Sequence, residues 1–415
     1  MKRRTYVATA AAIAVAGCMS ADDDDPGNES PTNDSATDDE PVDDDTETET
    51  ESTDAETDSF DDFEDLDAWS AVVGSLSADE EESYTGSQSA LLEADEEGDQ
   101  VRIVRELDDP TDFTDRHPGL AMATPEGGET LIQLLDDDGG RIDFRQYVGG
   151  GLPFARGNFG IAEVDDDPDL SEIVEIQIAF WVGSDGGGEL RVDDLHTVDR
   201  PNAGQVMIHL DGGYETHHTF ARPLLEEHDY PAAAFVPTGR LPEEDEHDGD
   251  RLTEGQLEEL ADDGWVVGSQ AAHGDDLTAL EDRSQEDEIA DARDWLADNG
   301  YDAGYFSYPG GRYDEETIAL VEEHHDLAFA GRYPAHGYVT NPYLCSRVSD
   351  PTADDARRIL ELTAEYGGIT TLAYYRLEEE ESREAFEETL EAVSELEGND
   401  LEVITPADLE SSYVV

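Results

Sequence analysis

Residues 206–213 of the chain read VMIHLDGG. A short apolar run that ends in an acidic residue and two glycines is typical of a buried strand followed by a turn. Similar runs recur through the second half of the chain. We therefore expect strands at Val206–Leu210, Ala232–Val236, Trp265–Gly268, Tyr305–Tyr308, Leu327–Ala330, Ile369–Tyr375 and Glu402–Ile404.

Segments with helical periodicity lie between these runs. Thr253 and Asp314 each precede acidic residues in the pattern of a helix N-cap. Strands that alternate with helices predict a parallel sheet with right-handed crossovers, and residues 200–415 are enough for one barrel domain. The helices are expected at Thr253–Asp262, Asp282–Asn299, Asp314–His324, Ala353–Tyr366 and Ser382–Glu397.

The pattern from residue 60 to residue 199 is different. Short alternating runs such as Val101–Val104 are separated by turns rich in Gly and Asp, which predicts an antiparallel β-sandwich. The pattern resembles jelly-roll carbohydrate-binding modules. The acidic loop 165–167 leaves calcium binding by this domain open. Four aromatic residues are either sugar-stacking platforms or core residues: Trp69, Tyr147, Phe154 and Trp181.

The composition is strongly acidic along the whole chain. There are 107 acidic residues against 23 basic ones, the formal net charge is −84, and Lys2 is the only lysine. Such a surface repels itself at low salt and is screened at molar salt, so the composition resembles that of proteins adapted to concentrated salt. Nucleic acids are not expected as partners, because phosphate binding needs clustered Lys and Arg.

The N-terminus has the form of an export signal. Lys2, Arg3 and Arg4 are basic, and a short apolar run follows that is too short to span a bilayer. Arg3 and Arg4 resemble a twin-arginine signal, and residues 15–18 resemble a lipobox with Cys18 as the lipidated residue. We expect residues 1–18 to be a signal peptide, residues 19–59 an unstructured acidic stalk, and Cys18 an anchor on the outer face of the cytoplasmic membrane.

The residues after the predicted strands should carry the chemistry, since a barrel places its functional residues at the C-terminal ends of strands. Residues 209–214 read HLDGGY, residues 267–277 read VGSQAAHGDDL, and residues 306–313 read FSYPGGRY. In this order they resemble the motifs of the polysaccharide deacetylase family, also called NodB-homology domains. The resemblance implies a distorted (β/α)7 barrel that removes acetyl groups from glycans.

The resemblance also implies a metal site that this sequence only partly retains. In the family one Asp and two His hold a divalent metal, usually zinc, which activates a water molecule. Gly212 stands at the position of the Asp ligand and Gln270 at that of the first His. His273 is the best match to the second His, with a spacing of three residues instead of four.

The acid–base positions are also only partly kept. Asp211 matches the family's general base, and Tyr375 falls at the position of the His that acts as general acid. Ser307 stands where many members have an Arg that orients the base. The family resemblance places the substrate against Tyr214, Tyr308, Pro309 and Arg312.

These substitutions leave three functions open. In the first, the protein binds glycans at the cell surface with a degraded metal site. In the second, it is an active carbohydrate N- or O-deacetylase that uses zinc or another divalent metal in a rebuilt site. His209, Asp211 and His273 would hold that metal, because residues 209 and 211 face the same side of their strand. In the third, it is a structural protein of the envelope.

Overall fold

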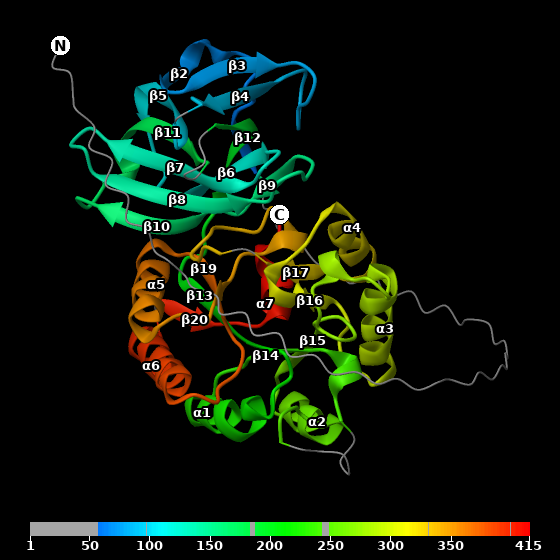
Figure 1. Cartoon of the computed structure of the whole chain (residues 1–415). Helices are drawn as coiled ribbons and strands as arrows, with labels where there is room; N and C mark the ends of the chain where they lie inside the picture. Colours follow the sequence, from blue (N-terminus) through cyan, green and yellow to red (C-terminus); the bar gives the residue numbers. More distant parts are fainter. Residues whose placement is uncertain (1–56, 97, 183–186, 243–248, 331, 399) are drawn as a thin grey trace, which may run out of the picture. The chain divides into compact units, whose positions relative to one another are not determined.

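The computed structural model describes residues 57–96, 98–182, 187–242, 249–330, 332–398 and 400–415 (Figure 1). The predicted signal peptide, the lipidated Cys18 and nearly all of the predicted stalk lie outside the described residues. No helix within the described ranges combines the length and the apolar character needed to cross a bilayer.

The described elements are twenty strands and seven α-helices. The strands are β1 (Asp58–Asp61), β2 (Ser70–Val73), β3 (Ser75–Asp79), β4 (Ser89–Ala94), β5 (Gln100–Thr111), β6 (Arg116–Ala123), β7 (Gly128–Asp136), β8 (Arg141–Val148), β9 (Ala155–Gly157), β10 (Gly160–Asp165), β11 (Ile173–Trp181), β12 (Gly188–Asp199), β13 (Gly204–Asp211), β14 (Ala233–Val236), β15 (Val266–Ser269), β16 (Tyr305–Ser307), β17 (Leu327–Phe329), β18 (Val348–Ser349), β19 (Ile369–Tyr374) and β20 (Leu401–Val403). The helices are α1 (Arg222–His228), α2 (Glu254–Asp262), α3 (Gln285–Asp298), α4 (Glu315–His324), α5 (Ala353–Tyr366), α6 (Glu380–Leu396) and α7 (Pro406–Tyr413).

Strands β1 to β12 form two antiparallel sheets. One sheet has the order β3-β4-β12-β6-β9 with β1 beside β12, and the other has the order β10-β8-β7-β11-β5-β2. In β5, Val101 and Ile103 are fully buried while the residues between them are partly exposed, which is the period of two expected for a strand with one face inward. Leu92 and Val192 of the first sheet share one core with Ile103 of the second, so the two sheets pack face to face.

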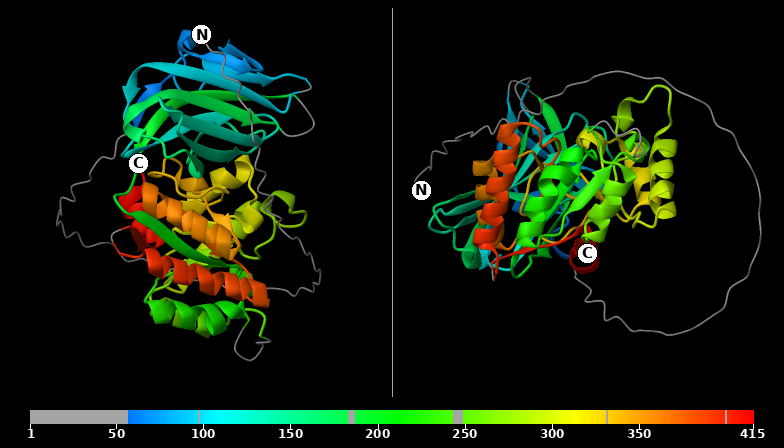
Figure 2. Two further views of the ribbon diagram at one scale, coloured as in Figure 1. Left: turned by 90° about the vertical axis from the view of Figure 1, so that its left-hand side faces the viewer. Right: turned by 90° about the horizontal axis from the view of Figure 1, so that it is seen from below.

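Strands β13 to β20 form a parallel sheet that curls. Its order is β17-β16-β15-β14-β13-β19-β18, with β20 beside the start of β13. Cys345 pairs with Phe329 of β17, and β18 pairs with β19 a few residues later. The segment from Cys345 to Ser349 therefore lies between β17 and β19 and joins the two edges of the sheet. Figure 2 shows the helices on the outside of these strands.

The prediction of an α/β fold with a parallel sheet and preceding antiparallel sheets is confirmed. The identity of the seventh strand needs a correction. The sequence points to Glu402–Ile404, but that segment is β20, which pairs only with the first three residues of β13. The strand between β17 and β19 is the two-residue β18, which is too short to produce a recognisable apolar run.

The predicted N-caps are confirmed. The Thr253 side chain accepts a hydrogen bond from the backbone of Gln256, and the Gln256 side chain accepts one from the backbone of Thr253. The Asp314 side chain caps α4 by accepting from the backbone of Thr317. Helix α3 begins at residue 285 instead of 282, because the Ser284 side chain takes the N-cap position. Helix α7 was not predicted.

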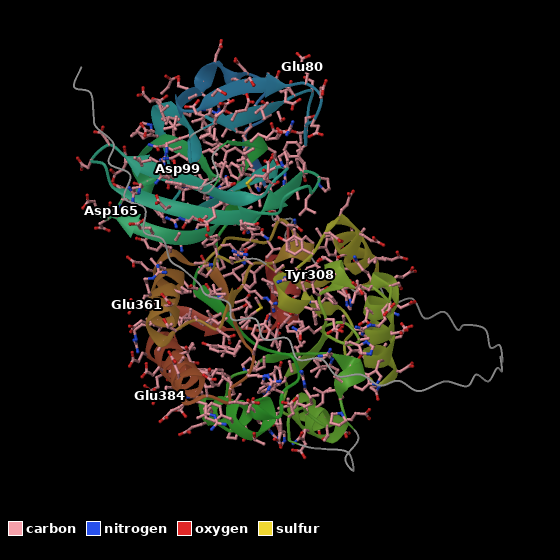
Figure 3. All side chains as sticks on the ribbon, viewed as in Figure 1. Glu80, Asp99, Asp165, Tyr308, Glu361 and Glu384 are labelled. Atoms are coloured by element: carbon pink, nitrogen blue, oxygen red, sulfur yellow. The ribbon has the colours of Figure 1, made fainter. Side chains whose placement is uncertain are left out.

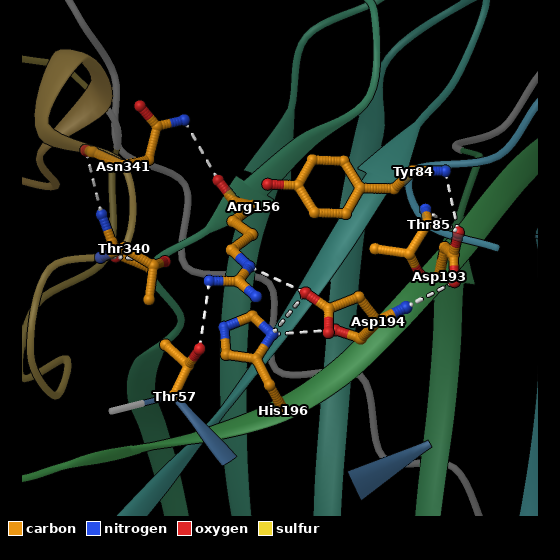
Figure 4. A network of polar contacts seen from close by, with 10 residues as sticks. Thr57, Tyr84, Thr85, Arg156, Asp193, Asp194, His196, Thr340 and Asn341 are labelled. Atoms are coloured by element: carbon orange, nitrogen blue, oxygen red, sulfur yellow. Dashed lines mark hydrogen bonds and ion pairs between the residues drawn. The ribbon is translucent and has the colours of Figure 1, made fainter. Parts of the chain in front are cut away.

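One segment of the barrel half is bonded to the sandwich half, and we call residues 332–347 the strap. The amide of Asn341 in the strap donates to the Arg156 carbonyl, 3.1 Å away (Figure 4). The Asn158 side chain accepts from the Thr340 backbone at 2.8 Å, and Gln146 donates to Ser346 at 3.0 Å. All the described residues belong to one compact unit.

Many acidic side chains point outward over both halves (Figure 3). Figure 3 labels Glu80, Asp99, Asp165, Glu361 and Glu384, all of which are exposed, whereas Tyr308 lies inside. The surface of the described residues therefore carries the charge that the composition indicates.

Candidate functional site

The site is built around the carboxylate of Asp211 at the C-terminal end of β13. The residue is fully buried, and one oxygen, Oδ2, accepts three hydrogen bonds. Gln270 donates to it at 2.9 Å, Ser307 at 2.7 Å and Arg347 at 2.7 Å. These donors come from the ends of β15 and β16 and from the residue before β18, so they meet at one end of the curled sheet.

Arg347 is the counter-ion of Asp211 and was not found from the sequence. Its side chain is 1% exposed, and it also donates to Ser307 at 2.7 Å and to the Tyr308 carbonyl at 3.3 Å. Burial opposes the charge of the guanidinium, but Asp211 beside it raises the pKa of Arg347 overall, so the guanidinium stays charged. The sequence feature that could have indicated this role is a single arginine between the apolar residues Cys345 and Val348.

The family's Asp ligand position is occupied by Gly212 in a conformation that suits glycine. Its φ is 96°, which L-residues rarely adopt, and a Cβ there would lie 2.5 Å from Cε2 of Tyr214. The Gly212 amide donates to the Phe235 carbonyl at 2.8 Å, and its own carbonyl accepts from Arg251. An aspartate at position 212 would thus require the backbone and Tyr214 to move.

The two family His positions are turned to other partners. The Gln270 side chain donates a hydrogen bond to Asp211, as described above. The His273 ring donates through Nδ1 to Glu288 at 2.8 Å, and its backbone amide donates to the other oxygen of Glu288 at 2.9 Å. Arg283 binds Glu288 as well, at 2.8 Å. His273 therefore belongs to an ion-pair network on α3, and Glu288 is a partner that the sequence did not reveal.

His209 faces the inside of the curled sheet, as its spacing from Asp211 predicts, but aromatic rings surround it. The ring centroids of Phe235 and Phe329 lie 4.9 and 4.6 Å away, and neither ring nitrogen has a partner among the described residues. Burial holds the pKa of His209 well below its usual value, so the ring is neutral. Within the described ranges, no three His, Cys, Asp or Glu side chains gather as a metal site.

Tyr375 lies at the rim with a residue that the sequence did not indicate, Asp350. The Tyr375 amide donates to Asp350 at 3.1 Å, and its carbonyl accepts from Nε2 of His217 at 2.7 Å. Although Asp350 is exposed, the protein around it desolvates the carboxyl group and raises its pKa to about 6. Burial also raises the pKa of the Tyr375 phenol, which keeps its proton.

The four residues expected to contact substrate have other surroundings. Tyr308 is fully buried and donates to the Tyr343 carbonyl at 3.0 Å, and Pro309 is buried beside it, so both serve the core. Arg312 is half-exposed and pairs with Asp276. The guanidinium groups of Arg251 and Arg376 lie 4.2 and 4.3 Å from the ring centroid of Tyr214, which limits its use as a stacking surface.

Among the sandwich aromatics, Trp69 is a core residue. It is 4% exposed, stacks on Phe63 and donates to Asp61 at 3.0 Å. Tyr147, Phe154 and Trp181 are partly exposed, and the guanidinium of Arg332 lies 4.7 Å from the Tyr147 ring.

Residues 199–326 match the family model described as polysaccharide deacetylase. The chain is also 32% identical over 126 residues to "Putative polysaccharide deacetylase YxkH" of Bacillus subtilis. That likeness covers 30% of this chain and 43% of the relative, so the chain spans less than half of the relative's length. The family match contains Asp211, Gly212, Gln270, His273 and Ser307, while Arg347, Asp350 and Tyr375 lie beyond its end.

Two solved structures each resemble a part of the chain. A family 4 carbohydrate esterase from Streptomyces lividans in complex with acetate covers 48% of this chain and 90% of its own, at 12% identity and a TM-score of 0.35. A family 11 carbohydrate-binding module of a cellulase of Clostridium thermocellum covers 35% of this chain and 95% of its own, at 13% identity and a TM-score of 0.28.

Proposed function

We propose that this protein is an exported, surface-anchored glycan-binding relative of the polysaccharide deacetylases whose distorted (β/α)7 barrel does not carry out the family's metal-dependent hydrolysis. One observation carries the proposal. The Asp211 carboxylate is held by the guanidinium of Arg347, and the neighbouring ligand position is a glycine with a φ of 96°.

The chemistry of the donor set supports this reading. A zinc site needs three or four donors from Cys, His, Asp or Glu, and positions 212 and 270 provide neither an imidazole nor a carboxylate. The guanidinium that already neutralises Asp211 would also repel a divalent cation at the same carboxylate. Asp211 is fully buried and accepts from three side chains, so its environment is that of a structural anion.

The other parts of the proposal rest on the sequence. The export signal, Cys18 as a lipid anchor and the acidic stalk support a place on the outer face of the cytoplasmic membrane. The composition supports a high-salt environment. A jelly-roll sandwich from residue 60 to 199 and a barrel from residue 200 to 415 would then present two glycan-binding domains at the surface.

The metal content and the acetate release of the purified full chain test the proposal. We expect less than stoichiometric zinc after dialysis against zinc and no acetate from acetylated chitooligosaccharides or acetylated xylan. The Gln270→His variant is expected to gain no zinc, because Gly212 still provides no ligand.

Stoichiometric zinc in the wild-type protein, together with acetate release that Asp211→Asn abolishes, would establish the active deacetylase instead. A metal-free protein that is retained on none of chitin, xylan or surface-glycan columns would leave the structural envelope role. The anchor is tested separately, since Cys18→Ser should release the protein from membranes.

A further inference from the structure

A cavity of about 340 Å³ lies apart from the Asp211 site. It is lined by residues at the turn between β5 and β6, by β7 and β8, by the loop 167–171 and by the C-terminal end of α5. A second cavity of about 340 Å³ adjoins it and shares the side chains of Phe113 and Arg116. Each volume lies at the lower end of the range for small-molecule sites, roughly 300–1,000 Å³.

The first cavity carries hydrogen-bond donors and acceptors in the same small space. Arg116 and Arg200 bring guanidinium donors, in a chain with only 23 basic residues. Asp167, Asp169 and Glu365 bring carboxylate acceptors. Groups of both kinds suit a ligand whose own polar groups both donate and accept, as hydroxyl groups do.

His117 lines the cavity as a buried imidazole. The residue is 3% exposed, and its Nδ1 has no hydrogen-bond partner among the described residues. Its ring also bonds to the backbone of Tyr366, which leaves Nε2 as the donor and Nδ1 as the unprotonated nitrogen. Burial lowers the pKa of His117 to about 3, so the ring stays neutral under working conditions.

Aromatic side chains complete the wall. Phe113, Phe144 and Tyr366 line the cavity, and Phe144 contacts the His117 ring with centroids 5.2 Å apart. A pyranose ring presents C–H groups on its faces and hydroxyl groups at its edge. Aromatic surface beside mixed donors and acceptors is therefore complementary to a sugar.

The charges in the cavity limit the kind of sugar. Three carboxylates in the lining and a net charge of −84 on the chain disfavour an anionic ligand such as a uronic acid. A neutral sugar, with or without an acetyl group, avoids this repulsion.

We propose that the two adjoining cavities form a binding site for a neutral oligosaccharide, with Phe113 and Arg116 between two neighbouring sugar residues. This inference deepens the glycan-binding part of the proposed function and rests on it. It places that binding beside α5 and the end of the sandwich rather than at Asp211.

Calorimetry on the full chain at constant high salt tests the site, with chitotetraose and cellotetraose as separate probes. We expect wild-type protein to bind at least one of them. Tyr366→Ala and Arg116→Ala should each weaken that binding by about tenfold or more. Tyr84→Ala, an exposed aromatic residue of the sandwich outside both cavities, should change it less than about twofold. Unfolding midpoints of the variants show whether each one is folded.

Side-chain footprinting of the wild-type protein with the bound probe locates the contact independently of any variant. Protection of Tyr366, which is partly exposed in the free protein, is the expected result. Protection confined to Tyr214 and Tyr375 would overturn this site and leave the proposed function standing. If neither probe binds, this site fails, and retention on the chitin, xylan and surface-glycan columns decides the glycan-binding part of the proposed function separately.

Discussion

At the scale of single residues, Asp211 is a buried anion balanced by one buried cation. The side chains of Arg347 and Asp211 are 1% and 0% exposed, with 2.7 Å between Nη1 and Oδ2. Removing one partner of such a pair leaves the other charge in a low-dielectric interior. We expect Arg347→Met to lower the free energy of unfolding by about 3–5 kcal/mol, as measured by denaturant titration at constant salt.

A surface pair provides the matched control. Arg357 and Glu395 are 2.7 Å apart, but their side chains are 41% and 63% exposed. Arg357→Met should therefore cost no more than about 1 kcal/mol. The double variant Arg347→Met/Asp211→Asn should be less destabilised than the sum of its two single changes. Equal losses at the buried and the surface arginine would contradict the role assigned to Arg347.

Several buried histidines make stability depend on pH. Burial lowers the pKa of His117 to about 3 and the pKa values of His217, His325 and His336 to about 4. Below the unfolded value near 6.5 the unfolded chain binds protons that the folded chain does not, so stability is lost as pH falls. Asp350, with a pKa raised to about 6, contributes one proton in the opposite direction.

For these four histidines and Asp350, the net difference between pH 6 and pH 5 is roughly three protons, or about 4 kcal/mol for that one unit. Burial also lowers the pKa values of His196 and His209, which adds to the loss of stability in the same direction. Denaturant titrations at pH 8, 7, 6 and 5 measure it, with little change expected between pH 8 and 7. His325→Gln, which removes one of the four groups, should lower the slope by about one proton. A slope near zero from pH 6 to 5 would show that these rings are protonated in the folded protein.

At the scale of elements, the strap places Arg347 in the barrel. Ser346, the residue before it, accepts from Gln146 of β8, and Asn158 bonds to Thr340 and Asn341. Asn158 is 5% exposed, so its replacement leaves buried polar groups without partners. We expect Asn158→Ala to cost about 2–3 kcal/mol of unfolding free energy in the full chain.

The informative measurement is a double-mutant cycle of Asn158→Ala with Arg347→Met. If the strap positions Arg347, the double variant should lose less unfolding free energy than the sum of the two single variants, by about 1 kcal/mol or more. Asn202→Ala, at an exposed position in the link before β13, is the control and should add independently. Strict additivity of Asn158 and Arg347 would mean that the sandwich does not hold the arginine in place.

The sequence predicts the elements whose signal is local. The apolar runs at β13 to β17 and the N-caps at Thr253 and Asp314 are properties of neighbouring residues, and they were found within a few positions. Asp211, Gln270 and Ser307 could also be placed together, because they follow strands of one parallel sheet. Arg347 could not be placed with them, because it lies 136 residues from Asp211 in the sequence. Its position depends on the two-residue strand β18 and on the strap, which is bonded to the sandwich.

The orientation of His209 could be predicted but not its surroundings. Alternation along β13 places it on the same side as Asp211, whereas the packing of Phe235 and Phe329 against it depends on two other strands. The partner of His273 was not predicted for a similar reason, because Glu288 lies on the following helix.

At the scale of the whole molecule, repulsion between carboxylates opposes folding. The formal net charge is −84, and on α6 alone Glu384, Glu387 and Glu391 are all exposed, with residues 387 and 391 one helical turn apart. The screening length falls from roughly 10 Å at 0.1 M salt to roughly 3 Å at 1 M, so KCl should relieve this repulsion. We expect the midpoint of thermal unfolding to rise by about 5–10 °C between these concentrations.

Removing surface charges shows whether salt stabilises the protein by screening these charges or through a general effect of solutes. The triple change Glu384→Gln, Glu387→Gln and Glu391→Gln should raise the unfolding midpoint at 0.1 M KCl and leave it nearly unchanged at 3 M, because screened charges no longer repel. Sucrose, which carries no charge, should stabilise the wild-type and the variant protein equally. If the variant gains as much at 3 M KCl as at 0.1 M, its effect comes from helix propensity rather than charge, and the acidic surface would not explain the response to salt.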